Sequence, residues 1–271
     1  MLVTDQFVYI HAPKTGGTFV TEVLFRIYEA TWGPTRLLEY HLFRRNIFRH
    51  HKYGRFIHRF PKHASVSEIP SEYANLAVIS TVRDSLDLLV SEYEFKWWQR
   101  KEYLPYYRVT PMWQVISSSF PNLSFSDFLS LMRQAFLPKP WLDAGLGYAL
   151  FTFVRHYCRD SKDVIESLPT IESHEDRLSR IRESVKSINF LSTAQLNIEL
   201  YALLGRFAYS PDDLQFILDK RRVHPLGRGR SASQTIDQYF TDDLRDSTLK
   251  QERLLVDLLP TICGVGKTLV D

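Results

Sequence analysis

The 271-residue sequence contains little cysteine, and this scarcity excludes disulfide-stabilised and zinc-stabilised folds. Its two cysteines, Cys158 and Cys263, are too few for a disulfide framework. They also lack the paired spacing and the accompanying histidines of a zinc site, so no metal is expected. We therefore predict that both thiols are reduced and buried.

Long hydrophobic runs are also missing. No segment approaches the roughly 20 uninterrupted apolar residues of a membrane-spanning helix, so no membrane span is expected. Residues 1–6 show neither the charged start nor the apolar stretch of a secretory signal peptide. These absences predict a soluble protein of the cytoplasm.

Internal repeats, low-complexity tracts and Gly/Ser-rich linkers are absent as well, so no boundary divides the chain. A chain of this length can bury roughly 70–75% of its unfolded surface in one core. We predict a single domain over residues 1–271.

The chain contains an alternation of strand and helix signals. Residues 7–10 and 76–82 are short apolar runs rich in β-formers, and each precedes an amphipathic segment, at 19–30 and just after Arg83. This order predicts an α/β fold of three layers, with a central parallel sheet flanked by helices and a ligand site beyond the carboxyl ends of the strands. Further along, the pattern predicts a strand at 188–192 and helices at 126–136, 148–158, 174–187, 198–207 and 242–259.

Positive charge is modest overall, at a formal +3, but it is concentrated in two stretches. Residues 44–63 and 220–230 are rich in Arg, Lys and His. Both stretches would suit an anionic ligand such as a nucleotide or an acidic glycan. The first fits solvated helix faces equally well.

The loop at residues 11–18, His-Ala-Pro-Lys-Thr-Gly-Gly-Thr, lies between a predicted strand and a predicted helix. The exposed N–H groups and the dipole at a helix start favour an anion. Gly16 and Gly17 let the backbone approach a phosphate closely, Thr15 and Thr18 offer hydroxyl groups, and Lys14 brings a mobile charge. The loop therefore predicts phosphate binding.

A P-loop nucleotide-dependent phosphotransferase or kinase is the alternative. Its motif places the lysine after the glycines, whereas Lys14 precedes them here. The strand at 76–82 is followed first by Arg83 and then by Asp84, not by the lone acidic residue of a magnesium site. A cation at that position indicates a second phosphate group.

The segment Pro13-Lys14-Thr15-Gly16-Gly17-Thr18 resembles the 5′-phosphosulfate loop of sulfotransferases that use 3′-phosphoadenosine-5′-phosphosulfate (PAPS). Arg83 and Ser91, eight residues apart, match the pair of this family that grips the 3′-phosphate, although Ser85 stands where the family often has proline. The resemblance implies a P-loop-like fold and transfer of a sulfuryl group to an acceptor hydroxyl without a metal, releasing 3′-phosphoadenosine-5′-phosphate (PAP). The donor-binding residues that it implies are Lys14, Thr15, Gly16, Gly17, Thr18, Arg83 and Ser91.

Lys62-His63-Ala64-Ser65 is similar to a segment of the carbohydrate-modifying branch of this family, in which the histidine is a candidate general base. The resemblance makes His63 the first candidate, because a group with a pKa near 6.5 can take the acceptor proton. His58 and then Glu68 are the alternatives. Lys14 would act as binder and catalyst by stabilising charge on the leaving nucleotide.

Residues 223–231 resemble the basic loop that closes over the 3′-phosphate in this family, and Arg228 and Arg230 are its candidate ligands. Residues 190–195 resemble a family strand that often ends in Thr-Glu, but Ala194 replaces the glutamate. A role of that glutamate therefore cannot be transferred to this chain.

The resemblance implies an acceptor hydroxyl on a carbohydrate or glycolipid. Tryptophans and tyrosines of the segment 97–141 can stack on a sugar, although most are expected in the core. A third interpretation, a noncatalytic module that binds anions or nucleic acid through residues 44–63, stays open. The enzyme interpretation predicts no nucleic acid partner.

Overall fold

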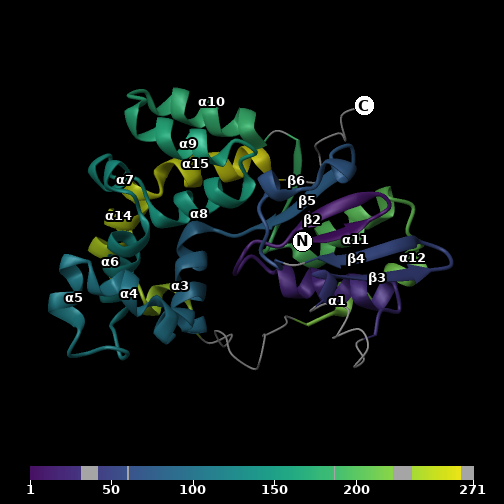
Figure 1. The fold of residues 1–271 in the computed structure, drawn as a ribbon, viewed down its shortest axis with the longest axis horizontal. Coiled ribbons are helices and arrows are strands. Elements are labelled where there is room, and N and C mark those ends of the chain that lie inside the picture. Colours follow the sequence, from purple (N-terminus) through teal and green to yellow (C-terminus); the bar gives the residue numbers. More distant parts are fainter. Residues whose placement is uncertain (32–41, 60, 186, 222–233, 264–271) are drawn as a thin grey trace.

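The strands of the described residues form one six-stranded sheet with the order β3-β4-β1-β2-β5-β6 (Figure 1). The computed structural model describes residues 1–31, 42–59, 61–185, 187–221 and 234–263. The strands are β1 (Leu2–Thr4), β2 (Phe7–Ile10), β3 (Arg45–His50), β4 (Gly54–Arg59), β5 (Ala77–Val82) and β6 (Ile188–Ser192).

The sheet is mixed, which corrects the prediction of a parallel sheet. β5 pairs in parallel with β2 and β6, but β1 is antiparallel to both β2 and β4, and β3 is antiparallel to β4. Only a few residues join β1 to β2 and β3 to β4, and such short connections allow only antiparallel pairing. The α/β class is confirmed, and only half of the sheet is parallel.

Helices cover both faces of the sheet, because successive residues of the strands point in opposite directions. Val8 and Ile10 pack in one hydrophobic cluster, whereas Phe7 and Tyr9 pack in another. The first cluster includes α7 (Lys139–Asp143), α8 (Tyr148–Tyr157), α9 (Ser161–Ser167), α10 (His174–Val185) and α15 (Arg253–Ile262). The second includes α1 (Gly17–Ile27), α11 (Leu196–Arg206), α12 (Pro211–Leu214) and α13 (Phe216–Asp219).

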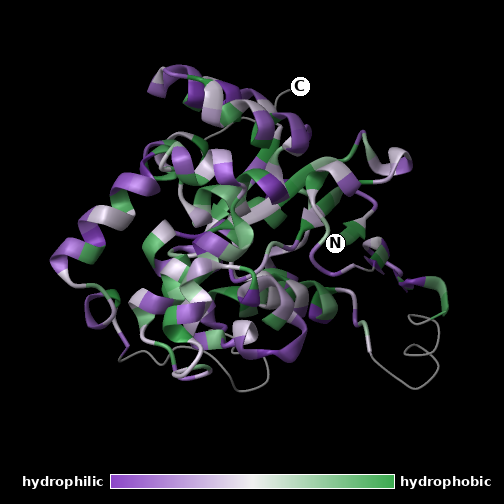
Figure 2. Ribbon diagram, turned by 60° about the vertical axis from the view of Figure 1, so that its left-hand side comes forward, coloured by the Kyte–Doolittle hydropathy of each residue, from purple (hydrophilic) through white to green (hydrophobic). Residues whose placement is uncertain are grey.

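A third cluster, rich in aromatic residues, lies beside the sheet and contains most of the segment from 86 to 136. Trp98, Tyr107 and Phe128 are fully buried in it. In Figure 2 the central strands are largely hydrophobic and the outer helices carry most of the hydrophilic residues. The helices of this third cluster are α3 (Ser85–Phe95), α4 (Leu104–Arg108), α5 (Pro111–Ile116), α6 (Phe125–Phe136) and, at its edge, α14 (Asp242–Gln251).

The basic stretch 44–63 forms the β3–β4 hairpin instead of a helix. Arg45 and Arg49 are exposed, whereas Phe48 and Phe56 are buried against the helix-covered face. β3 is the edge strand, and exposed arginines are a common protection of such an edge against further strand pairing. The many charged residues conceal the alternating pattern in the sequence.

The single helix predicted at 242–259 is two helices, α14 and α15, divided at Glu252. The Glu252 carboxylate is buried and accepts hydrogen bonds from the N–H groups of Ala149 and Leu150, both at 2.8 Å. These contacts cap the first turn of α8 and hold Glu252 outside helical geometry. No helix in the described part of the chain combines the length and apolar character needed to cross a membrane.

Candidate functional site

The predicted loop lies at the carboxyl end of β2, beside the carboxyl end of β5, and faces the helices α3 and α8 (Figure 1). β2, β5 and β6 are parallel neighbours, so the residues that follow them meet at one edge of the sheet. The Thr193 N–H donates a hydrogen bond to Val82 O at 2.9 Å, which joins the ends of β6 and β5. This edge therefore collects residues distant in sequence.

Both glycines of the loop are required by its geometry. Gly16 has a left-handed backbone with φ 85°, and a Cβ there would lie 2.9 Å from Leu196. A Cβ on Gly17 would lie 2.1 Å from the His11 ring. Lys14 is also left-handed, with φ 59°, so the loop alternates between backbone conformations in the manner of anion-binding nests.

The N–H groups of this loop point to an anion site. Those of Thr15, Gly16 and Gly17 lie at the start of α1, where backbone donors have no partner within the helix. α1 begins at Gly17 without a side-chain cap and without an acidic residue in its first turn. These donors and the uncompensated positive end of the helix dipole both favour a bound anion.

The Thr15 hydroxyl is not available to such a ligand. It donates to Ala12 O at 3.0 Å and contacts Thr81 Oγ1 at 3.0 Å, and the residue is buried. Thr15 thus fixes the loop on β5 and offers only its backbone N–H. Thr18 is half-buried in the first turn of α1.

Arg83 connects the two predicted motifs. It follows β5, and its Nη1 donates to Lys14 O at 2.9 Å, while its Nε pairs with Asp87 at 2.5 Å. The side chain remains 21% exposed, so part of the guanidinium faces outward. Ser91 lies farther along α3 and is half-buried. The structure thus brings Arg83 into contact with the loop. Ser91 lies on α3, the helix that also carries Asp87.

Lys14 lies beside a buried acid that sequence reasoning missed. Its Nζ is 3.7 Å from the centre of the Phe95 ring. Glu92 is 4% exposed and accepts a hydrogen bond from Trp97 Nε1. Burial lowers the pKa of Lys14 to about 8, against the attraction of Glu92, and burial raises the pKa of Glu92 to about 7, against the attraction of Lys14.

His63 is oriented by the loop. Its Nδ1 lies 2.9 Å from His11 O, and the two imidazole rings meet edge to face at 4.9 Å. Since a carbonyl only accepts hydrogen bonds, Nδ1 carries the hydrogen and Nε2 of the neutral ring is left as the base. Burial of part of the ring and the charges of Lys62 and Lys14 lower the pKa of His63, although its hydrogen bond to His11 opposes this effect.

The two alternative bases are less suitable. His58 is 7% exposed on β4, lies against the Phe25 ring, and has a pKa lowered to about 4, chiefly by burial. Glu68 accepts hydrogen bonds from the N–H and hydroxyl of Ser65 at 2.7 and 2.8 Å, which lower its pKa. His58 is enclosed, and Glu68 caps the short helix Val66–Glu68.

Comparisons with protein-family models, with curated proteins and with solved structures gave no match. What the site does must therefore be argued from its own chemistry.

Other predicted residues lie outside this site. Arg228 and Arg230 lie outside the described residues. Lys220, at the start of the second basic stretch, is paired with Glu22 on α1 at 2.8 Å. Of the aromatic residues of the middle segment, Trp98, Tyr107 and Trp141 are fully buried and form core, as expected for most of them.

Glu92, Phe95 and His11 are the site residues that sequence reasoning missed. An acid within the apolar segment that follows Arg83 was the available signal for Glu92. Phe95 and His11 carried no such signal, because an aromatic ring near a helix end and a histidine after a strand are common in any core. Only the packing of α3 against the loop brings Glu92 and Phe95 to Lys14.

Proposed function

We propose that this protein is a PAPS-dependent sulfotransferase with a P-loop-like nucleotide site. The hydrogen bond from Arg83 to Lys14 O is the observation that supports this proposal most directly. This hydrogen bond joins an anion-binding loop to a cation that follows the next parallel strand. A nucleotide with phosphates on both the 5′ and 3′ positions requires this arrangement. The donor groups at the loop fit a phosphosulfate, and Arg83 fits the 3′-phosphate.

In the proposed reaction, the acceptor oxygen forms a bond to sulfur while the bond from sulfur to the bridging phosphate oxygen breaks. Nε2 of His63 takes the proton of the acceptor hydroxyl. Lys14 and the N–H groups of the loop stabilise the negative charge on the oxygen of the departing PAP. The lowered pKa of His63 supports this role, because the ring is neutral at pH 7 and ready to accept a proton.

The proposed acceptor is a hydroxyl of a carbohydrate or glycolipid, and the proposed compartment is the cytoplasm. Both proposals rest on sequence alone. The acceptor proposal depends on the similarity of residues 62–65 to the carbohydrate-modifying branch, and the compartment proposal depends on the composition of the given sequence, which holds no long apolar run.

Calorimetric titration of the purified protein with PAP tests the proposal, with ADP and with ATP plus magnesium as comparisons. We expect PAP to bind without metal and at least about tenfold more tightly than ADP, a difference of about 1.4 kcal/mol. The variant Arg83→Ala should lose about 10- to 100-fold in PAP affinity, as expected for a charged hydrogen bond, and much less in ADP affinity.

The two nucleotides separate the role of Arg83 as a ligand from its support of the loop. An equal loss for PAP and ADP would mean that Arg83 only holds Lys14 in place. Arg83→Lys keeps the charge without the planar fork and should have intermediate affinity for PAP. Preference of the wild-type protein for ATP with magnesium would reject the proposal in favour of a phosphotransferase.

A further inference from the structure

A cavity lies among the helices beside the sheet, and its walls include no residue of the loop at residues 11–18. Its volume is about 430 Å³, and its walls come from α3, α6, α7, α8 and α14 together with Glu252. Neither the loop residues nor Arg83 line it. A volume of this size is typical of sites for small molecules.

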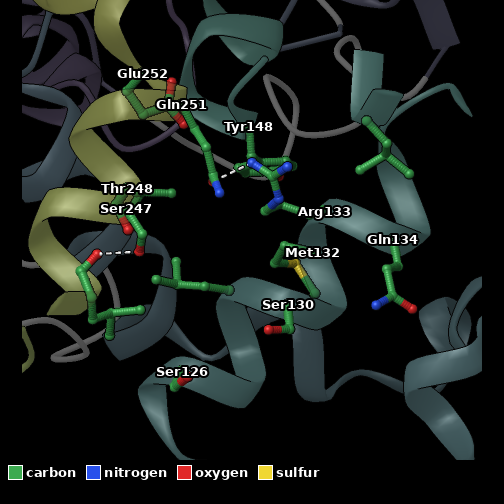
Figure 3. A pocket seen from close by; sticks show the side chains of 14 residues that line it. Ser126, Ser130, Met132, Arg133, Gln134, Tyr148, Ser247, Thr248, Gln251 and Glu252 are labelled. Atoms are coloured by element: carbon green, nitrogen blue, oxygen red, sulfur yellow. Dashed lines mark hydrogen bonds between the residues drawn. The ribbon is translucent and has the colours of Figure 1, made fainter. Parts of the chain in front are cut away.

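The cavity has both apolar and polar walls, and Arg133, Gln251 and Glu252 lie together at one end of it (Figure 3). Leu89, Leu129, Leu142 and Leu244 contribute aliphatic surface from four different helices. Figure 3 shows the Arg133 guanidinium between Gln251 and Tyr148, above the Met132 side chain. The lining therefore suits a ligand with an apolar body and a polar head.

Arg133 has donors to spare at this end. Its Nη1 donates to Gln251 Oε1 and, at 3.5 Å, to Leu146 O. Among the described residues, both hydrogen bonds of the Arg133 side chain come from Nη1, and no carboxylate forms an ion pair with it. The side chain is half-buried, and this burial lowers the pKa of Arg133.

The nearby acid Glu252 attracts this guanidinium electrostatically, but its oxygens are hydrogen-bonded to other groups. Both carboxylate oxygens of Glu252 accept hydrogen bonds from α8, from Ala149 and Leu150. A Cβ on Gly147 would lie 2.1 Å from the Glu252 carboxyl carbon, so the acid is held tightly in this position. Arg133 consequently keeps two donor directions for an anion that the protein itself does not supply.

We infer that this cavity is a second binding site, for a small amphipathic carboxylate. The planar guanidinium would take the carboxylate through Nε and Nη2, a geometry that arginine offers and a neutral polar group does not. The aliphatic body of the ligand would lie along the leucine wall and be removed from water. This inference is independent of the sulfuryl-transfer proposal, because the two sites share no residue.

Octanoate is a suitable probe, with octanol and octylamine as matched ligands of the same chain length. In calorimetric titration of the full chain, octanoate should bind at least about tenfold more tightly than octanol. Octylamine should not bind measurably, because its ammonium would face Arg133. Equal binding of octanoate and octanol, or no binding of octanoate, would overturn the inference.

Two variants locate the bound probe. Arg133→Gln should weaken octanoate binding by about tenfold or more and leave octanol unchanged. Leu244→Trp fills the cavity without changing Arg133 and should abolish octanoate binding. Leu244 is only half-buried, so the Leu244→Trp variant should remain folded. It therefore tests the site even if Arg133→Gln unfolds the protein. Octanoate affinity that is unchanged in a folded Leu244→Trp variant would place the probe elsewhere and reject the site.

Discussion

At the scale of single residues, the proposed chemistry depends on the protonation states of Lys14 and His63. Partial burial favours the neutral form of Lys14 and lowers its pKa, and the attraction of the Glu92 carboxylate is the main effect that raises this pKa. Glu92 is thus a positioning residue, because it acts on the ligand only through Lys14. Its burial beside Trp97 keeps this influence strong, since water does not screen it.

Glu92→Gln should therefore shift the pH dependence of nucleotide binding. In the wild-type protein, PAP affinity should fall as pH rises through about 8, where free Lys14 loses its proton. Glutamine can still accept the Trp97 hydrogen bond but carries no charge, so the pKa of Lys14 falls and the loss of affinity begins at lower pH. At pH 8 the affinity for PAP should drop about three- to tenfold, measured by calorimetry between pH 6 and 9. If PAP affinity falls with the same pH midpoint in Glu92→Gln as in the wild-type protein, Glu92 has only a structural role.

His63→Ala should separate catalysis from donor binding. We expect turnover to fall by about 10²- to 10⁴-fold and PAP affinity to stay within about twofold, because His63 contacts the loop at His11, through its carbonyl and its ring. In the wild-type protein the rate should decline on the acid side of a pKa below 6.5, where Nε2 becomes protonated. Wild-type-like rates in this variant would exclude His63 as the base. His51→Ala changes an exposed histidine of the hairpin and serves as the control.

At the scale of an element, the start of α1 depends on the absence of a side chain at Gly17. A methyl group there meets the His11 ring at 2.1 Å, and this ring is itself packed against His63. Either the helix start or His11 must move. A shift of either group disturbs both the N–H groups at the helix start and the carbonyl that orients the base.

Gly17→Ala should therefore reduce stability by about 1–3 kcal/mol, as for other overpacked positions, and weaken PAP binding at the same time. Chemical denaturation and PAP titration measure the two effects. Gly205→Ala is the matched control, because Gly205 lies in α11 and a Cβ there meets nothing within 4 Å. This control should stabilise the protein by up to about 1 kcal/mol. Equal behaviour of the two variants would contradict the assigned role of Gly17.

At the scale of the whole molecule, Glu252 joins the C-terminal helices to α8. Burial raises its pKa to about 7 in the folded protein, above the ordinary value of 4.5. A carboxyl with a raised folded-state pKa binds its proton more tightly when folded, so its contribution to stability is complete below pH 4.5 and is lost as pH rises to about 7. The buried His58 and the half-buried His156 of α8, each with a pKa of about 4, act with the opposite sign, because stability falls when they must become charged at low pH.

Comparison of the wild-type protein with Glu252→Gln isolates this contribution. The difference in unfolding free energy between the two proteins should change by about 3 kcal/mol between pH 4.5 and pH 7, with the wild-type protein losing relative stability as pH rises. Urea denaturation at several pH values gives this difference, and the histidine contributions cancel in it. A difference that is constant across this range would mean that Glu252 does not titrate there.

The sequence alone was sufficient for the elements with strong local patterns. The predicted strands at 7–10, 76–82 and 188–192 correspond to β2, β5 and β6, and most of the long helices begin and end within a few residues of their predicted limits. These three strands are the parallel part of the sheet, where burial on both faces produces continuous apolar runs. β1, β3 and β4 were missed, because β1 is only three residues long and exposed arginines interrupt the pattern of the hairpin.

For the site, the sequence determined the loop with its glycines, the cation after β5 and the histidine at 63, since each rests on residues adjacent in the chain. Only the tertiary structure decided their relations. Arg83 bonds to the carbonyl of Lys14, Thr15 turns its hydroxyl inward to Thr81, and His63 is oriented by His11. The tertiary structure also decided that Glu92 faces Lys14 and that Glu252 divides the last helix by capping α8. Local propensity follows neighbouring residues, whereas the burial of a charge and the partner that it meets depend on segments that only folding brings together.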